Sequence, residues 1–220
     1  MLDLLLPQRC LVCLLPGGHV CDGCRSSLRR IEPPLCERCG APTAWPVRRC
    51  AECAGRRLAF ARARAAVAYD KPVPQLVGAW KERGLRRLAR WAAAIVAETI
   101  PAPSVSCLAY VPGDADRRLK RGHHAAERLA RELGDAWGLP VLALLARSAG
   151  SSRQLGLARA ERRRNVAGAF RPTARSPARV ALVDDVYTTG ATVNAASSAL
   201  RQSGARRVEV VTFARTIRRR

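Results

Sequence analysis

The chain has 220 residues, of which 48% are hydrophobic and 25% are charged, as in ordinary globular proteins. No apolar run approaches the roughly 20 residues that a membrane-spanning helix needs, which argues against a helical membrane protein. The formal net charge is +22, from 39 Lys and Arg residues against 17 Asp and Glu residues. Such an excess of positive charge favours polyanionic partners, either nucleic acid or phosphorylated substrates.

The N-terminal sequence MLDLLLPQRC lacks the basic start of a secretory signal peptide. It also reaches Pro7 and Cys10 too early for the apolar region of such a peptide. We therefore expect a cytoplasmic protein with no membrane span. The length suits either one large domain or a small domain beside a medium one.

Eight of the nine cysteines lie in the first 53 residues, as four C-x-x-C pairs. Two such pairs can place four sulfur atoms around one tetrahedral ion, and Zn²⁺ is the ion that such sites bind. Four sulfur ligands leave no open position for chemistry, so two structural zinc ions are expected. We expect consecutive pairs to share an ion, although interleaved pairing is also compatible with the spacing. The predicted ligands are Cys10, Cys13, Cys21, Cys24, Cys36, Cys39, Cys50 and Cys53.

Other roles for these cysteines are less well supported. A disulfide framework normally accompanies a secretory signal, and a redox-active C-x-x-C normally occurs once, beside a strand. His19 could replace a sulfur ligand, but a solvated loop histidine is the better interpretation. The segment is rich in Gly and Pro, as expected of a module that metal holds together. We predict a zinc-ribbon module over residues 1–58 and a second domain over residues 59–220.

The second domain shows alternating strand and helix patterns, which predict an α/β fold with a mostly parallel sheet and helices on both faces. Segment 148–171 is rich in Arg, Ser and Gly and is predicted to be a long loop, a kind that is uncommon unless functional. In chain order, the remaining patterns are a short apolar segment at Ala65–Tyr69, helical spacing from Val77 to Ile95, a strand at Cys107–Val111, a helix at Ala125–Trp137, a further strand at Pro140–Leu145, and strand, helix and strand at Arg179–Val183, Ala195–Leu200 and Val208–Phe213.

The stretch VALVDDVYTTGAT, Val180–Thr192, carries the clearest chemical pattern of this domain. Its apolar start fits a buried strand, which places Asp184 and Asp185 at the carboxyl end, where open α/β sheets bind ligands. A helix is expected to start near Gly190, and its free N–H groups attract anions. Acids beside such an anion site suit a sugar phosphate. The alternative is that Thr189 is an ordinary helix cap and that both acids are turn residues.

This stretch resembles the phosphoribosyl pyrophosphate (PRPP) loop of type I phosphoribosyltransferases, and the chain as a whole resembles the ComF family. Three further motifs carry the resemblance: YVP at Tyr110–Pro112, RRLKRG at Arg117–Gly122 and ERRRNVAGAF at Glu161–Phe170. Members of this family join a cysteine-rich zinc module to a phosphoribosyltransferase-like domain. The resemblance therefore implies a type I phosphoribosyltransferase-like, mostly parallel sheet flanked by helices and preceded by a small zinc-ribbon module.

The resemblance also implies a role for individual residues. Asp184 and Asp185 would contact the ribose hydroxyls, with Asp184 nearer a Mg²⁺-bound diol. The PRPP-binding residues would be Val186, Tyr187, Thr188, Thr189, Gly190, Ala191 and Thr192. The pyrophosphate loop and the flexible hood would contribute Arg117, Arg118, Arg121, Gln154, Arg162 and Asn165, the arginines matching phosphate oxygens with their fixed donors. His123 and His124 depart from the family, which has an aromatic residue and an asparagine there; we expect them to cap or flank the next helix.

Two functions follow from these observations. The first is an Mg²⁺-dependent phosphoribosyltransferase that uses PRPP and an acceptor that no motif identifies. The second is a nucleic-acid-binding accessory protein in DNA uptake, whose PRPP pocket is regulatory or vestigial. The resemblance implies single-stranded DNA and a competence helicase as partners for the second, and it is compatible with an oligomer. Aromatic residues make up 5% of the chain without a basic-aromatic stripe, which argues against extensive base stacking.

Overall fold

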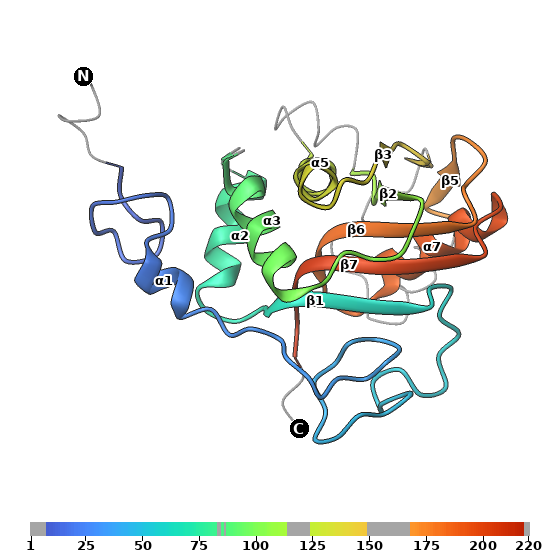
Figure 1. The fold of residues 1–220 in the computed structure, drawn as a ribbon, viewed down its shortest axis with the longest axis horizontal. Coiled ribbons are helices and arrows are strands. Elements are labelled where there is room, and N and C mark those ends of the chain that lie inside the picture. The colour runs from blue at the N-terminus through green and yellow to red at the C-terminus, as the bar shows by residue number, and fades with distance from the viewer. Residues whose placement is uncertain (1–7, 83–84, 86, 114–123, 149–167, 218–220) are drawn as a thin grey trace.

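A computed structural model describes residues 8–82, 85, 87–113, 124–148 and 168–217 (Figure 1). None of the helices in these ranges is long and apolar enough to cross a membrane. In chain order the elements are α1 (Asp22–Ser26), β1 (Arg62–Ala68), α2 (Val73–Glu82), α3 (Arg87–Thr99), β2 (Cys107–Tyr110), α5 (Ala125–Trp137), β3 (Val141–Leu142), β4 (Leu145–Arg147), β5 (Phe170–Pro172), β6 (Arg179–Tyr187), α7 (Ala191–Gln202) and β7 (Arg207–Arg215).

The main sheet has the strand order β1-β7-β6-β2-β3, and every pair of neighbours in it is parallel. β4 and β5 form a separate antiparallel pair. The central strand β6 is buried from Val180 to Val183, which is why its sequence is continuously apolar. The expected α/β class with a mostly parallel sheet is therefore confirmed.

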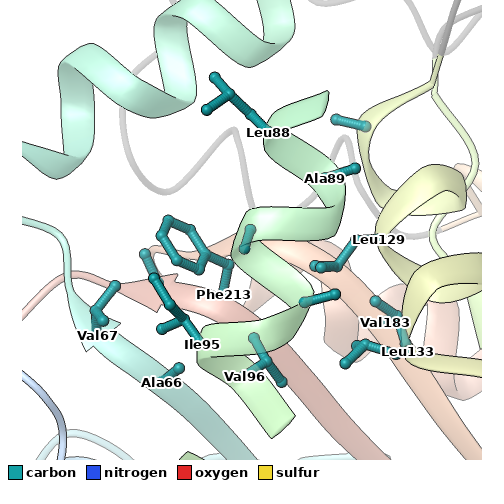
Figure 2. Close-up of a cluster of buried hydrophobic side chains, with 14 of the residues drawn as sticks. Ala66, Val67, Leu88, Ala89, Ile95, Val96, Leu129, Leu133, Val183 and Phe213 are labelled. Atoms are coloured by element: carbon teal, nitrogen blue, oxygen red, sulfur yellow. The ribbon is translucent and has the colours of Figure 1, made fainter. Parts of the chain in front are cut away.

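Two apolar clusters lie on opposite faces of the sheet. The first cluster joins α2, α3 and α5 to the sheet, and Figure 2 shows Ile95 of α3 and Leu133 of α5 beside Phe213 of β7 and Val183 of β6. The second cluster joins α7 to the sheet and also contains Cys36, Cys39 and Cys53. One of the cysteine-rich segments is thus part of the core of the α/β domain.

Helix α5 has the boundaries that its sequence pattern predicts. His124 is the N-cap, and its Nδ1 accepts a hydrogen bond from the Glu127 N–H at 3.2 Å. Gly138 ends the helix with φ of 66°, a left-handed conformation that glycine adopts at low cost. The expected capping role is confirmed for His124, whereas His123 lies outside the described residues.

Several other elements differ from the expected boundaries, and the strand predicted at Pro140–Leu145 is divided between β3 and β4. The helical pattern from Val77 to Ile95 is divided between α2 and α3. Strand β6 continues four residues past Val183 to Tyr187, because its pairing with β7 extends to Arg215. Within the predicted long loop 148–171, residues 149–167 lie outside the described part of the chain. Strand β5 begins at Phe170, inside the predicted loop and not after its end.

The two cysteine-rich segments lie in different places, and we call residues 10–24 the first ribbon and residues 36–53 the second ribbon. The first ribbon lies beside α2 and α3, whereas the second lies below β1 in Figure 1. The segment between them runs antiparallel to β1, with Ile31 N–H bonded to Ala66 O at 2.9 Å. It thereby covers an edge that would otherwise expose unpaired backbone groups. The domain boundary at residue 58 stays a prediction.

Candidate functional site

The eight N-terminal cysteines form two separate clusters, each with its four sulfur atoms within 4.8 Å of one another. Cys10, Cys13, Cys21 and Cys24 make the first cluster, and Cys36, Cys39, Cys50 and Cys53 make the second. Consecutive pairing is therefore confirmed, and His19 and Cys107 belong to neither cluster. The Sγ atoms of Cys36 and Cys53 are 3.6 Å apart, close to the ~3.8 Å that a tetrahedral site with Zn–S bonds of about 2.3 Å requires.

Backbone amides lower the pKa of one thiol in the second cluster. Burial opposes ionisation of Cys36, but backbone N–H groups of the two knuckles outweigh it and lower the pKa of this thiol to about 7. One of these donors is the Cys50 N–H, 3.3 Å from Cys36 Sγ. Thiolate is the form that binds metal, and burial raises the pKa of the Cys39 and Cys53 thiols in the same cluster. The donor set and the distances fit two structural zinc ions.

The two clusters differ in their surroundings. In the second, Cys36, Cys39 and Cys53 are all buried and contact the apolar cluster below the sheet. In the first, Cys10 is buried but Cys13 is exposed. A metal ion in the second ribbon therefore supports the packing of the α/β domain, whereas one in the first ribbon orders a more peripheral segment.

The turn from β6 into α7 is formed by Thr188–Thr192, which we call the TTGAT loop. Gly190 is the N-cap of α7 and has φ of 73°, in the left-handed region. A Cβ at this position would lie 2.3 Å from the Tyr187 hydroxyl oxygen. Both the backbone conformation and the available space therefore require glycine here.

The N-cap of α7 is Gly190, which has no side chain that could accept a hydrogen bond from the first turn of the helix. Thr189 precedes the N-cap, and its Oγ1 accepts a hydrogen bond from the Ala191 N–H at 3.3 Å. Backbone N–H groups in the first turn of a helix lack intrahelical partners and carry a partial positive charge. The TTGAT loop thus presents hydroxyl groups and a helix N-terminus in one turn.

The two acids lie within the last four residues of β6, next to this turn. Asp185 is nearly buried, with a side-chain exposure of 11%, and its Oδ2 is 2.6 Å from Lys81 Nζ. Asp184 Oδ1 accepts a hydrogen bond from the Asp185 N–H at 2.9 Å. The acid pair therefore lies at the end of β6 directly before the TTGAT loop, and the binding roles of these residues stay predictions.

Lys81 is a residue of this region that the sequence did not reveal. It lies in the last turn of α2, more than a hundred positions before Asp185, so no local motif connects the two residues. One available signal was its rarity, because the chain has three lysines among 39 basic residues. Its ammonium group compensates the charge of a carboxylate that has little access to water.

Strand β2 brings a second predicted motif to the same end of the sheet. Tyr110 pairs with Val183 of β6, and the Val111 N–H donates to Val183 O at 3.0 Å. The segment that follows Tyr110–Pro112 therefore starts beside the acid pair. Arg117, Arg118 and Arg121 lie outside the described residues, so their positions relative to this site stay predictions.

The predicted hood is bracketed by β4 and β5. Ser148 N–H donates to Ala169 O at 2.9 Å, and Ser148 Oγ donates to Gly168 O at 2.7 Å. The Arg147 guanidinium lies 5.5 Å from the centre of the Phe170 ring. The two ends of segment 149–167 are thus held together. Gln154, Arg162 and Asn165 are within this segment and outside the described residues.

The region that follows the second ribbon contacts the TTGAT loop and α7 directly. Arg56 Nη2 donates to Thr189 O at 2.8 Å, and the Ala59 N–H donates to Asn194 Oδ1 at 2.7 Å. From the C-terminal side, Thr216 Oγ1 donates to Thr188 O at 3.0 Å. Two parts of the chain far from the loop in sequence therefore fix its backbone.

Comparison with known proteins gives matches for both parts of the chain. Residues 1–54 match the family described as Double zinc ribbon domain. Competence protein F of Haemophilus influenzae is 27% identical over 94% of this chain and 96% of its own length. DNA utilization protein YhgH of Salmonella typhi is 27% identical over 97% of this chain and 100% of its own length.

Among solved structures, the chain is similar to the glutamine PRPP amidotransferase of B. subtilis in complex with ADP and GMP, with a TM-score of 0.39 and 21% identity over 58% of this chain and 25% of that chain. It is also similar to TT1426 of Thermus thermophilus, with a TM-score of 0.35 and 22% identity over 57% of this chain and 82% of that chain. The double zinc ribbon and the full-length similarity to Competence protein F and YhgH confirm the resemblance of this chain to the ComF family.

Proposed function

We propose that this protein binds Mg²⁺·PRPP at the carboxyl end of β6 and transfers its phosphoribosyl group to an acceptor. The observation that carries this proposal is the continuity of three features along one stretch of chain. An acid pair, a hydroxyl-rich turn and a helix N-terminus whose N-cap is a glycine follow one another from Asp184 to Thr192. A sugar phosphate carries a diol, which suits the acid pair, and a phosphate, which suits a helix N-terminus.

In this proposal the TTGAT loop holds the 5′-phosphate through the N–H groups of α7 and the threonine hydroxyls. Asp184 contacts the ribose diol and its Mg²⁺, because carboxylates together with substrate oxygens are the usual ligands of this ion. Lys81 keeps the neighbouring Asp185 compensated and fixed. When bound, Mg²⁺ would neutralise charge that develops on the pyrophosphate.

The chemistry needs no covalent intermediate with the protein. The bond from the ribose C1 to the pyrophosphate oxygen breaks, pyrophosphate leaves with the bonding electrons, and the acceptor forms a new bond at C1. The chain contributes positioning and electrostatic stabilisation, which supply most of the rate enhancement in reactions of this kind. Arg117, Arg118 and Arg121 are proposed to contact the pyrophosphate. Gln154, Arg162 and Asn165 are proposed to belong to the hood that excludes water.

The test is calorimetric titration of Mg²⁺·PRPP into the zinc-replete protein and into an Asp184→Asn/Asp185→Asn variant, at low and high salt. We expect saturable binding that weakens by about 100-fold or more in the variant, or roughly 2.7 kcal/mol. Removing two negative charges makes the protein more basic. Unspecific attraction of a polyanion would therefore become stronger in the variant, whereas specific binding at the proposed site would become weaker.

The matched control is Glu132→Gln/Asp135→Asn on α5, which removes the same charge away from the β6–α7 turn. It is expected to bind Mg²⁺·PRPP as the unaltered protein does. Binding of equal strength in all three proteins that fades with salt would contradict the proposed site. Such a result would show that the basic surface of the protein attracts PRPP without a specific site.

Nucleic-acid binding in DNA uptake is the second candidate, with the PRPP pocket regulatory or vestigial. The observation that favours it is Trp45 of the second ribbon, which is 69% exposed and is followed by the exposed Arg48 and Arg49. An exposed aromatic ring beside cations can stack on a base of single-stranded DNA. The relatives named DNA utilization protein agree with this candidate. A helicase partner stays a prediction of the family resemblance.

A further inference from the structure

We propose that Arg215 is a positioning residue that makes the conformation of the TTGAT loop depend on the zinc-bound second ribbon. This inference rests on the proposed function only in taking a phosphate as the ligand of the TTGAT loop. The order of the loop itself can be measured without any ligand, so the two proposals can fail separately.

Arg215 is a buried cation whose partners come from the second ribbon. It ends β7, and its side chain is 1% exposed. Its Nη1 donates to Cys39 O at 2.5 Å, and its Nη2 lies 3.0 Å from Glu52 Oε2. Cys39 is a predicted zinc ligand and Glu52 lies between two others. An unpaired buried charge is energetically costly. Arg215 is therefore stable in this position only when the ribbon is folded around its metal and supplies both partners.

On its other side, Arg215 supports the residue that precedes the TTGAT loop. Its guanidinium lies 5.0 Å from the ring centre of Tyr187, its partner in the pairing of β6 and β7. The Tyr187 ring is also in edge contact with Phe60, with centres 6.4 Å apart. The hydroxyl end of this ring lies against Gly190, where an added Cβ would be 2.3 Å from the hydroxyl oxygen.

A second contact follows a parallel route from the second ribbon to the loop. Arg56, three residues after the last predicted ligand Cys53, donates from Nη2 to Thr189 O at 2.8 Å. The neighbouring Arg57 is exposed. Both routes start at the second cysteine cluster and end at the backbone of the TTGAT loop or directly below it.

The first ribbon makes its contacts elsewhere. Arg30, which follows it, pairs with Glu98 of α3, and Gln75 of α2 donates to Leu11 O. These contacts lie on the side of α2 and α3, away from α7. We therefore infer that the two zinc ions have different roles, and that the ion of the second ribbon supports the anion-binding turn.

The experiment is hydrogen exchange of the zinc-replete full chain without ligand, followed in the Ala191 and Asn194 amides, which donate hydrogen bonds to Thr189 Oγ1 and Gly190 O in the loop. We compare Arg215→Leu with Arg30→Leu, and Arg56→Gln with its exposed neighbour Arg57→Gln. We expect exchange in the loop to become at least about 10-fold faster in Arg215→Leu and Arg56→Gln, because local opening frees these amides. It should be unchanged in the two controls, and the amides of α5 should keep their protection.

Unchanged loop exchange in both Arg215→Leu and Arg56→Gln would overturn the inference. Equal acceleration in the loop and in α5 would overturn it too, because it would reveal general destabilisation. Arg56→Gln keeps the test decisive if Arg215→Leu does not fold, since Arg56 is partly exposed. If the unaltered protein binds no Mg²⁺·PRPP while its loop exchange still responds to these substitutions, the proposed function fails and this inference stands.

Discussion

Replacing Gly190 with alanine is expected to lower the affinity for Mg²⁺·PRPP by about 100-fold or more while the protein stays folded. The left-handed φ of 73° costs an alanine roughly 1–2 kcal/mol. The larger effect is steric, because the new Cβ would lie 2.3 Å from the Tyr187 hydroxyl oxygen. Either the ring or the backbone of the turn must move, and with it the N–H groups proposed to hold the phosphate. Calorimetric titration beside thermal unfolding measures both effects.

The control for this substitution is Gly138→Ala at the end of α5. Gly138 has a similar φ of 66°, and no atom lies within 4 Å of an added Cβ there. Gly138→Ala should therefore show only the free-energy cost of the left-handed backbone. We expect a small loss of stability and an unaltered affinity for Mg²⁺·PRPP. If Gly190→Ala binds Mg²⁺·PRPP as tightly as Gly138→Ala does, the TTGAT loop does not hold the phosphate.

Removing one ligand of the second zinc site is expected to destabilise the protein far more than removing one ligand of the first. Cys36→Ser should lower the melting temperature by more than about 10 °C, the size expected from a loss of about 4 kcal/mol in a domain of this length. Cys36 is buried in the apolar cluster that also contains Val180 and Leu200. A metal ion there would contribute directly to folding, because it would bind four sulfur atoms that exist close together only in the folded chain.

Cys13→Ser is the matched variant, because Cys13 is exposed in the first cluster. Metal analysis of both proteins should show about one zinc ion per chain in place of two. The melting temperature of Cys13→Ser should fall by a few degrees at most. Equal losses of stability in the two variants would show that both ribbons stabilise the α/β domain to the same extent. This result would contradict the different roles inferred from the burial of Cys36 and the exposure of Cys13.

Much of the fold could be predicted from patterns that are local in the sequence. The apolar run Val180–Val183 indicated a buried strand, and the helical pattern Ala125–Trp137, preceded by His124, indicated α5. The spacing of the cysteines indicated two metal clusters, whereas their consecutive pairing, expected beside an interleaved alternative, is established by the geometry. These features depend on neighbouring residues, so the sequence carries them directly.

The features that could not be predicted depend on contacts between distant residues. Strand β6 reaches Tyr187 because β7 continues beside it as far as Arg215, which no pattern inside β6 reveals. Lys81 meets Asp185 because α2 packs over the end of the sheet. The place of the second ribbon in the core depends on Arg215 and Cys39, which are 176 positions apart. Such contacts follow from the tertiary fold and are invisible to spacing and periodicity.

The most direct test of the proposed site is to record the backbone amide resonances of the ¹⁵N-labelled, zinc-replete protein during a titration with Mg²⁺·PRPP. We expect the largest and saturable shifts at Thr188–Thr192 and at Asp184 and Asp185, since these groups would contact the phosphate and the ribose. Amides of α1 and α3 should move little. Shifts spread over exposed arginine-rich surfaces, with the TTGAT loop unaffected, would contradict a sugar-phosphate site at the end of β6.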